Sequence, residues 1–411
     1  MPRPLTIAVV GGPMYDALYA SRLPAFTAET GIPVEIGARL IHAELNEHLD
    51  RLYGSRQGHY DLITTHTKYA PSQAPWLLPL DDLLPADALA DFEPATVELA
   101  RVDGALLGVP RNVDARLLHY RTDLLDDPRE QRSFRARFGY DLAPPATWEA
   151  FADVARHFAR PAGLYGFAFP GKESGLWGTF FELLAAAGGQ MFGQDLRAAF
   201  VTPEGAWALG LLRDLYLTWQ AAPPELPGWQ FDTVSQAFQE GRVAMIADWP
   251  GTYASHASSP IGDRFDVALY PAGPAGRRVY SGGFTWAIPT SAADPAASLA
   301  LLLFLTSAES QAVEAARGVL TPRRSVQQAV REAAASGSRE ARRLALLDET
   351  IATAMLVPPR FAAYPAVEAA LWPALQQGIT GALTVEEALA EAARRMDAVL
   401  QTDTERGGDN G

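Results

Sequence analysis

Residues 234–251 read VSQAFQEGRVAMIADWPG, a succession that predicts a helix, a strand and a turn. The apolar side chains of VSQAF fall on one face at helical spacing, so they predict a short amphipathic helix. Gly241 can adopt the left-handed conformation that closes a helix, so we expect the helix to end there. Residues 243–247 are an apolar run of strand length, which predicts a strand buried on both faces.

The turn after this strand carries groups that suit a binding site. Asp248 supplies a carboxylate and Trp249 a flat apolar ring, directly at the strand's carboxyl end. In open α/β sheets ligands bind at that end of the strands, so both are candidate ligand-binding residues. A structural interpretation stays open beside it, in which Trp249 covers a core edge and Asp248 caps the next turn.

Short strands alternate with helices in the first part of the chain. Residues 5–10, 32–36 and 60–63 have strand character, and amphipathic helical patterns separate them. This alternation predicts a parallel sheet with right-handed crossovers. Gly11 and Gly12 end the first strand, either as a plain turn or as a tight turn that lets the strand end approach a ligand.

Length and composition limit the classes of protein to consider. With 411 residues the chain is long for one hydrophobic core, so we expect two domains. A hydrophobic fraction of 48% and a charged fraction of 20% are typical of a globular protein. The net charge of -14 and the absence of a basic patch argue against a nucleic acid partner. No apolar run approaches the roughly 20 residues that span a bilayer.

Several kinds of chemistry are missing from the sequence. With no cysteine, the chain cannot form disulfides, thiolate metal sites or a thiol nucleophile. It contains no G-x-S-x-G elbow, H-E-x-x-H helix, Walker A loop or EF-hand loop. We therefore expect no metal, no cofactor and no enzymatic activity. One enzymatic alternative stays open, a secreted glycosidase that uses Asp114 with Asp248, which the separation of the two carboxylates would decide.

Motifs in five places along the chain resemble one protein family. The motif F-x-x-G-R-x-A-M at residues 238–245, followed by a turn with Trp249, resembles the extracellular solute-binding proteins of ABC importers. The carbohydrate-binding group that includes maltose-binding protein is the most similar. The other four segments are G-V-P at 108–110, P-A-T-W-E at 145–149, S-G-G-F-T-W-A-I-P at 281–289 and G-V-L-T-P-R-R at 318–324.

The resemblance implies an α/β fold of two lobes, the type II periplasmic-binding-protein fold. Each lobe is expected to hold a mostly parallel sheet flanked by helices, with the ligand cleft between the lobes. The expected N-terminal lobe comprises residues 1–112 and 271–319, and the expected C-terminal lobe residues 113–270 and 320–411. The chain is expected to cross between the lobes near residues 112–114, 269–271 and 318–321.

The function implied by the resemblance is the capture of a solute for an ABC importer. We expect aromatic stacking and hydrogen bonds to hold a sugar or oligosaccharide, and hinge closure to prepare the bound form for the importer's membrane subunits. The protein is expected to be a monomer in the periplasm or another extracytoplasmic space, with its leader removed or its start assigned downstream. Residues 64–68, TTHTK, depart from the sugar-binding pattern. A non-sugar solute, such as a polyol, peptide, polyamine or anion, therefore stays an alternative.

The expected ligand-binding residues come from both lobes. They are Gly12, Tyr15, Thr65, His66, Asp114, Trp177, Asp248, Trp249, Gly282, Gly283, Trp286, Arg323 and Tyr364. The resemblance places the Asp114 carboxylate against sugar hydroxyls, and the two adjacent glycines would let backbone amides come close to the ligand. Structural roles stay open for two further residues, since Trp177 suits a core equally well and Arg323 could form a surface ion pair.

Overall fold

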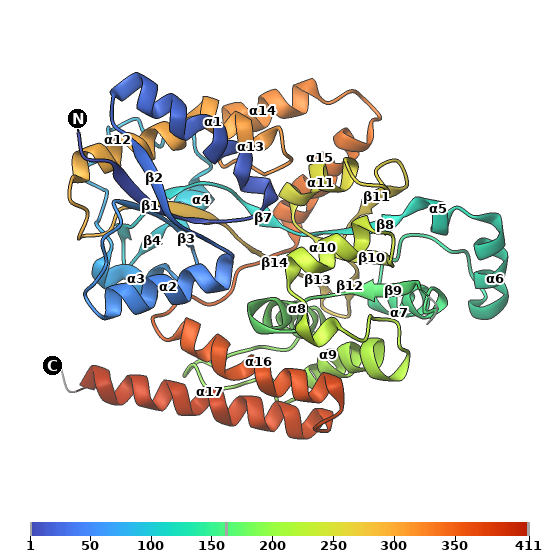
Figure 1. The fold of residues 1–411 in the computed structure, drawn as a ribbon. Coiled ribbons are helices and arrows are strands. Elements are labelled where there is room, and N and C mark those ends of the chain that lie inside the picture. The colour runs from blue at the N-terminus through green and yellow to red at the C-terminus, as the bar shows by residue number, and fades with distance from the viewer. Residues whose placement is uncertain (1, 161–162, 409–411) are drawn as a thin grey trace.

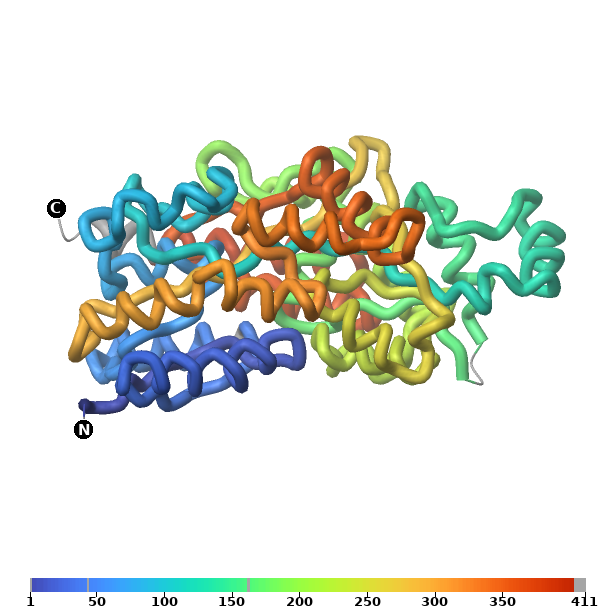
Figure 2. Tube along the Cα trace, turned by 90° about the horizontal axis from the view of Figure 1, so that it is seen from above, coloured from blue at the N-terminus to red at the C-terminus, as the bar shows by residue number. Residues whose placement is uncertain are grey.

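The structure, a computed structural model, describes residues 2–160 and 163–408. Figure 1 shows two bodies, each built from a β-sheet with helices packed against it, and a group of short strands between them. Figure 2 gives the view from above, in which the two bodies lie end to end along the long dimension of the molecule. The first body contains the beginning of the chain, and the second contains most of its middle part.

The first body is organised around a five-stranded sheet in the order β2-β1-β3-β15-β6. β1 pairs in parallel with β2 and β3, whereas β15 runs antiparallel to β3 and β6, so one strand is reversed. The strands are β1 (Leu5–Val10), β2 (Val34–Leu40), β3 (Leu62–His66), β6 (Val109–Pro110) and β15 (Phe284–Ala287). Its helices are α1 (Pro13–Thr30), α2 (His42–Gly54), α3 (Ala70–Gln73), α4 (Pro94–Glu98), α12 (Pro295–Leu305) and α13 (Ala308–Ala315).

The second body is organised around a four-stranded sheet in the order β11-β8-β10-β9. Here β8 is the reversed strand, because it pairs antiparallel with β10 and β11 while β9 and β10 are parallel. The strands are β8 (Leu117–Arg121), β9 (Tyr165–Ala168), β10 (Val243–Asp248) and β11 (Phe265–Ala268). Its helices are α5 (Thr122–Leu125), α6 (Pro128–Phe138), α7 (Trp148–His157), α8 (Glu173–Ala187), α9 (Pro203–Arg213), α10 (Phe231–Gln239) and α11 (Tyr253–Ala257).

Short strands connect the two bodies. The strand β7 (Asp114–Ala115) pairs with β14 (Val279–Gly282), which also pairs with β16 (Met355–Leu356). Val113 forms a further bridge with Leu320. Several passages of the chain therefore run side by side through the same narrow region. The chain then ends in the helices α14 (Arg324–Ala333), α15 (Arg339–Thr353), α16 (Tyr364–Thr380) and α17 (Val385–Gly408).

Two separate clusters of buried apolar side chains fill the two bodies. Apart from Tyr69, one cluster draws on residues 113–280 and 320–396, and the other draws on residues 5–109 and 284–305. The lobe boundaries stay a prediction, and we propose that they follow these clusters. On this proposal the chain makes its second crossing between the lobes at residues 282–283 rather than at 269–271, because Val279 and Tyr280 pack with the larger cluster.

The stretch at residues 234–251 folds as its sequence predicts. Helix α10 begins three residues earlier than expected, and Gly241 follows its end with a φ of 77°. Strand β10 lies between β8 and β9, and each of its residues is buried. Because neighbouring strands hold β10 on both sides, the turn at Trp249 starts from a rigid support.

The last two long helices lie against each other along one side of the second body (Figure 1). A capping box starts α17, because the Thr384 N–H donates to Glu387 Oε2 at 2.9 Å and the Glu387 N–H donates to Thr384 Oγ1 at 3.2 Å. Within the described ranges no single helix has the length and apolar character needed to cross a membrane. Helices α12 and α13 meet that requirement only as a pair, which is bent by 50°.

Candidate functional site

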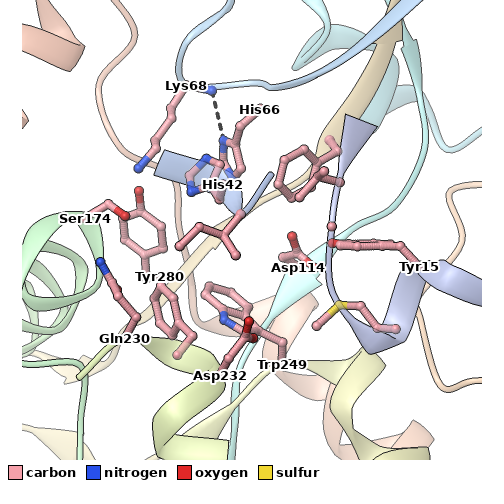
Figure 3. Close-up of a pocket in the computed structure, with 16 residues that line it drawn as sticks. Tyr15, His42, His66, Lys68, Asp114, Ser174, Gln230, Asp232, Trp249 and Tyr280 are labelled. Carbon is pink, nitrogen blue, oxygen red and sulfur yellow. Dashed lines mark hydrogen bonds between the residues drawn. The ribbon is translucent and has the colours of Figure 1, made fainter. Parts of the chain in front are cut away.

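A cavity of about 110 Å³ lies between the two bodies, beside the ends of their strands. Its wall includes side chains that follow β1, β3 and β10, together with the first turns of α1, α2 and α10. Figure 3 labels ten of the lining residues, which project into the cavity from several sides. They are Tyr15, His42, His66, Lys68, Asp114, Ser174, Gln230, Asp232, Trp249 and Tyr280.

Trp249 provides a flat apolar surface in the cavity wall. Its backbone N–H donates to Asp248 Oδ1 at 2.8 Å, and its ring meets the Phe231 ring edge-on with centroids 5.4 Å apart. The Arg116 guanidinium lies 5.2 Å from the centroid of the same ring. These contacts fix the orientation of the indole before a ligand arrives, which lowers the cost of binding.

Asp248 supports Trp249 and does not line the cavity, which corrects its expected role. Its Oδ2 accepts a hydrogen bond from Ser235 Oγ and lies 2.8 Å from His256 Nε2, while Oδ1 accepts the Trp249 N–H. Burial raises the pKa of Asp248, but the hydrogen bond and charge of His256 outweigh burial, so the net pKa is lowered. Asp114 and Asp248 therefore do not both face the cavity, as a pair of glycosidase carboxylates would.

Asp114 brings a carboxyl group into the wall from the strands between the two bodies. Its Oδ1 accepts a hydrogen bond from Asn112 Nδ2 at 2.8 Å. Burial raises the pKa of Asp114 to about 7, although Asn112 and Arg111 lower it in part, and the charge of Glu314 adds to the rise. Near neutral pH this carboxyl group can therefore donate a hydrogen bond as well as accept one.

The raised pKa of Asp114 predicts a pH-dependent loss of stability. Between the ordinary value of 3.8 and the folded value of about 7, the folded chain keeps a proton that the unfolded chain releases. The contribution of Asp114 to stability therefore falls as pH rises through this window. Asp114→Asn should reduce that fall by up to about 4 kcal/mol. Thermal melting from about pH 4 to about pH 8 measures the effect. The exposed Asp82→Asn serves as control, and equal pH slopes for Asp114→Asn and wild type would contradict the prediction.

Two neutral histidines lie across the cavity from Trp249 (Figure 3). The rings of His42 and His66 have centroids 4.8 Å apart. Burial, reinforced by the charge of Lys68, lowers the pKa of each ring well below its usual range. The Lys68 N–H donates to His66 Nδ1 at 3.2 Å. Among the described residues His42 Nε2 is buried and has no hydrogen-bond partner.

Known proteins share this arrangement of two sheets with a cavity between them. A sequence profile of the family described as bacterial extracellular solute-binding protein matches residues 23–312. The chain belongs to this family. This solute-binding protein is 29% identical over 257 residues to a probable ABC transporter-binding protein of Deinococcus radiodurans, covering 60% of this chain and 58% of that one. It is 28% identical over 284 residues to the mannitol-binding protein of Pseudomonas aeruginosa, covering 65% and 60% of the two chains.

The match to a solved structure covers the whole fold. The maltose-bound MalE3 protein of T. maritima aligns with a TM-score of 0.85 and 25% identity, covering 97% of this chain and all of that one, 100%. The two bodies are therefore the lobes of a periplasmic-binding-protein fold, which confirms the expected fold class. The sequence matches to the curated relatives span 58% and 60% of those relatives' own lengths.

The cavity of this solute-binding protein brings together four of the expected residues, Tyr15, His66, Asp114 and Trp249. Tyr15 lies on the first turn of α1, and its side chain points into the cavity from the N-terminal lobe (Figure 3). Gly12 stands just before this helix with a φ of 129°, a conformation that favours glycine, and is not part of the wall.

Three aromatic residues expected in the cleft lie in the lobe cores instead. Trp177 and Tyr364 are fully buried in the C-terminal lobe, where Trp177 Nε1 donates to the Tyr364 hydroxyl at 2.6 Å. Trp286 is fully buried in the N-terminal lobe, edge-on to Tyr19. Their positions follow from packing, because α8 lies against α16 and β15 lies between β3 and β6.

Arg323 forms a structural ion pair away from the cavity, which is the alternative that the sequence left open. Its Nε donates to the Thr306 carbonyl at 2.6 Å, and its Nη1 lies 3.3 Å from Asp91 Oδ2. The guanidinium also lies 4.4 Å from the centroid of the Phe92 ring. These contacts tie the segment before α14 to the N-terminal lobe.

The glycine pair at the junction of β14 and β15 allows close packing of protein segments, and neither glycine lines the cavity. A Cβ added at Gly282 would lie 2.5 Å from His66 Cε1. A Cβ added at Gly283 would lie 2.2 Å from the Asn112 carbonyl oxygen. Thr65 is likewise buried behind the wall, where its Oγ1 donates to the side chain of a neighbouring glutamine.

Several lining residues were missed by sequence reasoning. Ser174, Gln230 and Asp232 lie near the starts of α8 and α10, and Tyr280 lies on β14. The sequence contained a signal for Gln230 and Asp232, because they flank the start of the helix that opens the 234–251 stretch. The side chains of a helix start next to a strand-end site are suitably placed to reach a ligand.

Proposed function

We propose that this protein is the solute-binding component of an ABC importer and captures a sugar or polyol in the cavity between its lobes. The observation that carries the proposal is the apolar face of Trp249 across from the polar groups of His42, with Asp114 at the side. Sugars and polyols present C–H groups as well as many hydroxyls, so they match such a wall. Two relatives add support, one named a mannitol-binding protein and the other solved with maltose bound.

The polar groups of the wall suit hydroxyls better than a charged ligand. A neutral His42 ring can donate or accept through Nε2, and Asp114 can do both when protonated. The charge of Lys68 is already balanced, because its Nζ lies 2.8 Å from Glu368 Oε1. A hydroxyl ligand would use these groups without adding a net charge to a buried site.

Closure around the ligand is part of the proposed function. The wall draws on both lobes, and short neighbouring strands connect them, so a hinge motion there would open and close the cavity. A ligand that touches both lobes favours the closed population by its greater affinity for that state. The closed, loaded protein would then dock on the membrane subunits of an importer outside the cytoplasm, as a monomer.

A thermal-shift screen tests the proposal. The panel holds pentoses, hexoses, pentitols, hexitols, disaccharides, amino acids, polyamines and organic acids. A ligand present at about 100 times its dissociation constant should add roughly 2.7 kcal/mol of stability. We expect selective stabilisation by a sugar or polyol that mass spectrometry then recovers unchanged. Stabilisation by an amine or acid alone would contradict the proposed ligand class, and conversion of the ligand would contradict a binding function.

A further inference from the structure

A buried ion pair stands at one side of the cavity. The side chains of Lys68 and Glu368 are only 2% and 6% exposed, and Lys68 Nζ lies 2.8 Å from Glu368 Oε1. The Tyr69 hydroxyl donates to Glu368 Oε2 at 2.6 Å, so both carboxylate oxygens are engaged. Lys68 follows β3 of the N-terminal lobe, whereas Glu368 lies on α16, so the pair joins segments from distant parts of the chain.

This ion pair forms part of the boundary between two cavities. Lys68 lines the ligand cavity, while Glu368 and Tyr69 line a second cavity of about 360 Å³ that reaches α2 and α16. Ser174 belongs to the wall of both cavities, so they adjoin at this residue. Figure 3 shows Lys68 and Tyr280 on the side of the ligand cavity that is nearest to Ser174. A ligand that extended from the first cavity toward the second would meet the ion pair.

The ion pair is poorly suited to move aside for a ligand. Separating Lys68 from Glu368 would leave two buried charges without their counter-ions, which is strongly unfavourable. Aromatic rings also surround the ammonium group, with Nζ 4.7 Å from the centroid of Tyr69 and 5.7 Å from that of Tyr280. The pair therefore acts as a fixed wall.

We infer that the Lys68–Glu368 pair determines ligand length, restricting the protein to one sugar ring or a polyol of similar length. The inference rests on the proposed sugar or polyol function and narrows its substrate class. It also explains what the departure at residues 64–68 does, since Lys68 ends that segment and supplies half of the wall.

Calorimetric titration with matched ligands tests the inference. The probes are pentoses, hexoses, pentitols and hexitols on one side, and maltose, cellobiose, trehalose and maltotriose on the other. Wild-type protein should bind its best single-ring sugar or polyol at least about 100-fold more tightly than any of the oligosaccharides. The double variant Lys68→Ala/Glu368→Ala removes both charges together and opens the wall, so this ratio should fall at least about 10-fold.

A second double variant is the matched control. Lys68→Met/Glu368→Leu also removes both charges but keeps most of the side-chain volume, so the length ratio should stay near that of wild type. A wild-type protein that binds an oligosaccharide as tightly as the single-ring ligands would overturn the inference, whether or not the variants fold, and leave the proposed function intact. An unchanged ratio in a folded alanine double variant would also overturn it. A wild-type protein that binds no sugar or polyol would instead overturn the proposed function.

Discussion

Replacing Trp249 by alanine should weaken binding of the sugar or polyol about 100-fold, which corresponds to about 2.8 kcal/mol. The indole gives the ligand an apolar surface, and its orientation is fixed by the Asp248 carboxylate, the Phe231 ring and the Arg116 guanidinium. Truncation removes the surface while the hydrogen-bonding groups across the cavity remain. The loss should therefore appear as weaker affinity with the same preference among hydroxyl-bearing ligands.

Two further tryptophan variants make the Trp249 test specific. Trp249→Phe keeps a smaller aromatic face, so it should lose clearly less affinity than the alanine variant. Trp207→Ala removes a half-buried indole of α9 outside the cavity wall, so it should lower the melting temperature without changing the dissociation constant. Calorimetric titration measures all three proteins. A folded Trp249→Ala protein with wild-type affinity would show that Trp249 does not contribute to ligand binding.

Glu314→Ala should destabilise the N-terminal lobe by about 3–5 kcal/mol. Glu314 is buried and receives hydrogen bonds from the Arg111 guanidinium, with Nη2 at 2.7 Å and Nε at 3.0 Å from Oε1. Burial raises the pKa of Glu314, although the charge and hydrogen bonds of Arg111 lower it in part. Removing the carboxylate leaves a buried guanidinium without its counter-ion, and the Tyr19 hydroxyl remains its neutral partner at 2.7 Å.

The same helix offers a matched control for Glu314. Glu309 also lies on α13 and also pairs with an arginine, since its Oε1 lies 2.6 Å from Arg22 Nη1, but its side chain is 74% exposed. Solvent screens this pair, so Glu309→Ala should cost only about 0–1 kcal/mol. Scanning calorimetry compares the two variants and can resolve separate transitions of the lobes. Equal losses of stability from both substitutions would show that burial does not determine how much the Glu314–Arg111 pair stabilises the fold.

The local order of helix, strand and turn at residues 234–251 could be predicted because neighbouring residues determine it. A helical apolar face, a glycine able to adopt a positive φ and an apolar run lie in succession, and α10, Gly241 and β10 follow them. Strand ends converge in an α/β fold, which is why Trp249 could be placed near a ligand. Asp114 was placed there by the resemblance to the family alone.

The remaining errors at the site come from contacts between residues far apart in the sequence. Nothing local shows that Trp177 faces the core, because its partner Tyr364 is 187 residues away. The Lys68–Glu368 pair spans 300 residues, so no local spacing could have predicted it. Asp248 is different, because its partners Ser235 and His256 lie nearby in the sequence. Whether both side chains reach the Asp248 carboxylate depends on how α10 and α11 pack.

The position of β15 also constrains the order in which the molecule can be completed. β15 lies between β3 and β6, and it brings Thr285 beside Thr65, 220 residues earlier in the chain. A ribosome must therefore synthesise more than two thirds of the chain before the first sheet can close, whereas the second sheet has all its strands once β11 is made. Until then β3 presents an unpaired apolar edge, which is prone to wrong pairing. The sheet whose first strands are made earliest is thus the sheet that receives its last strand later.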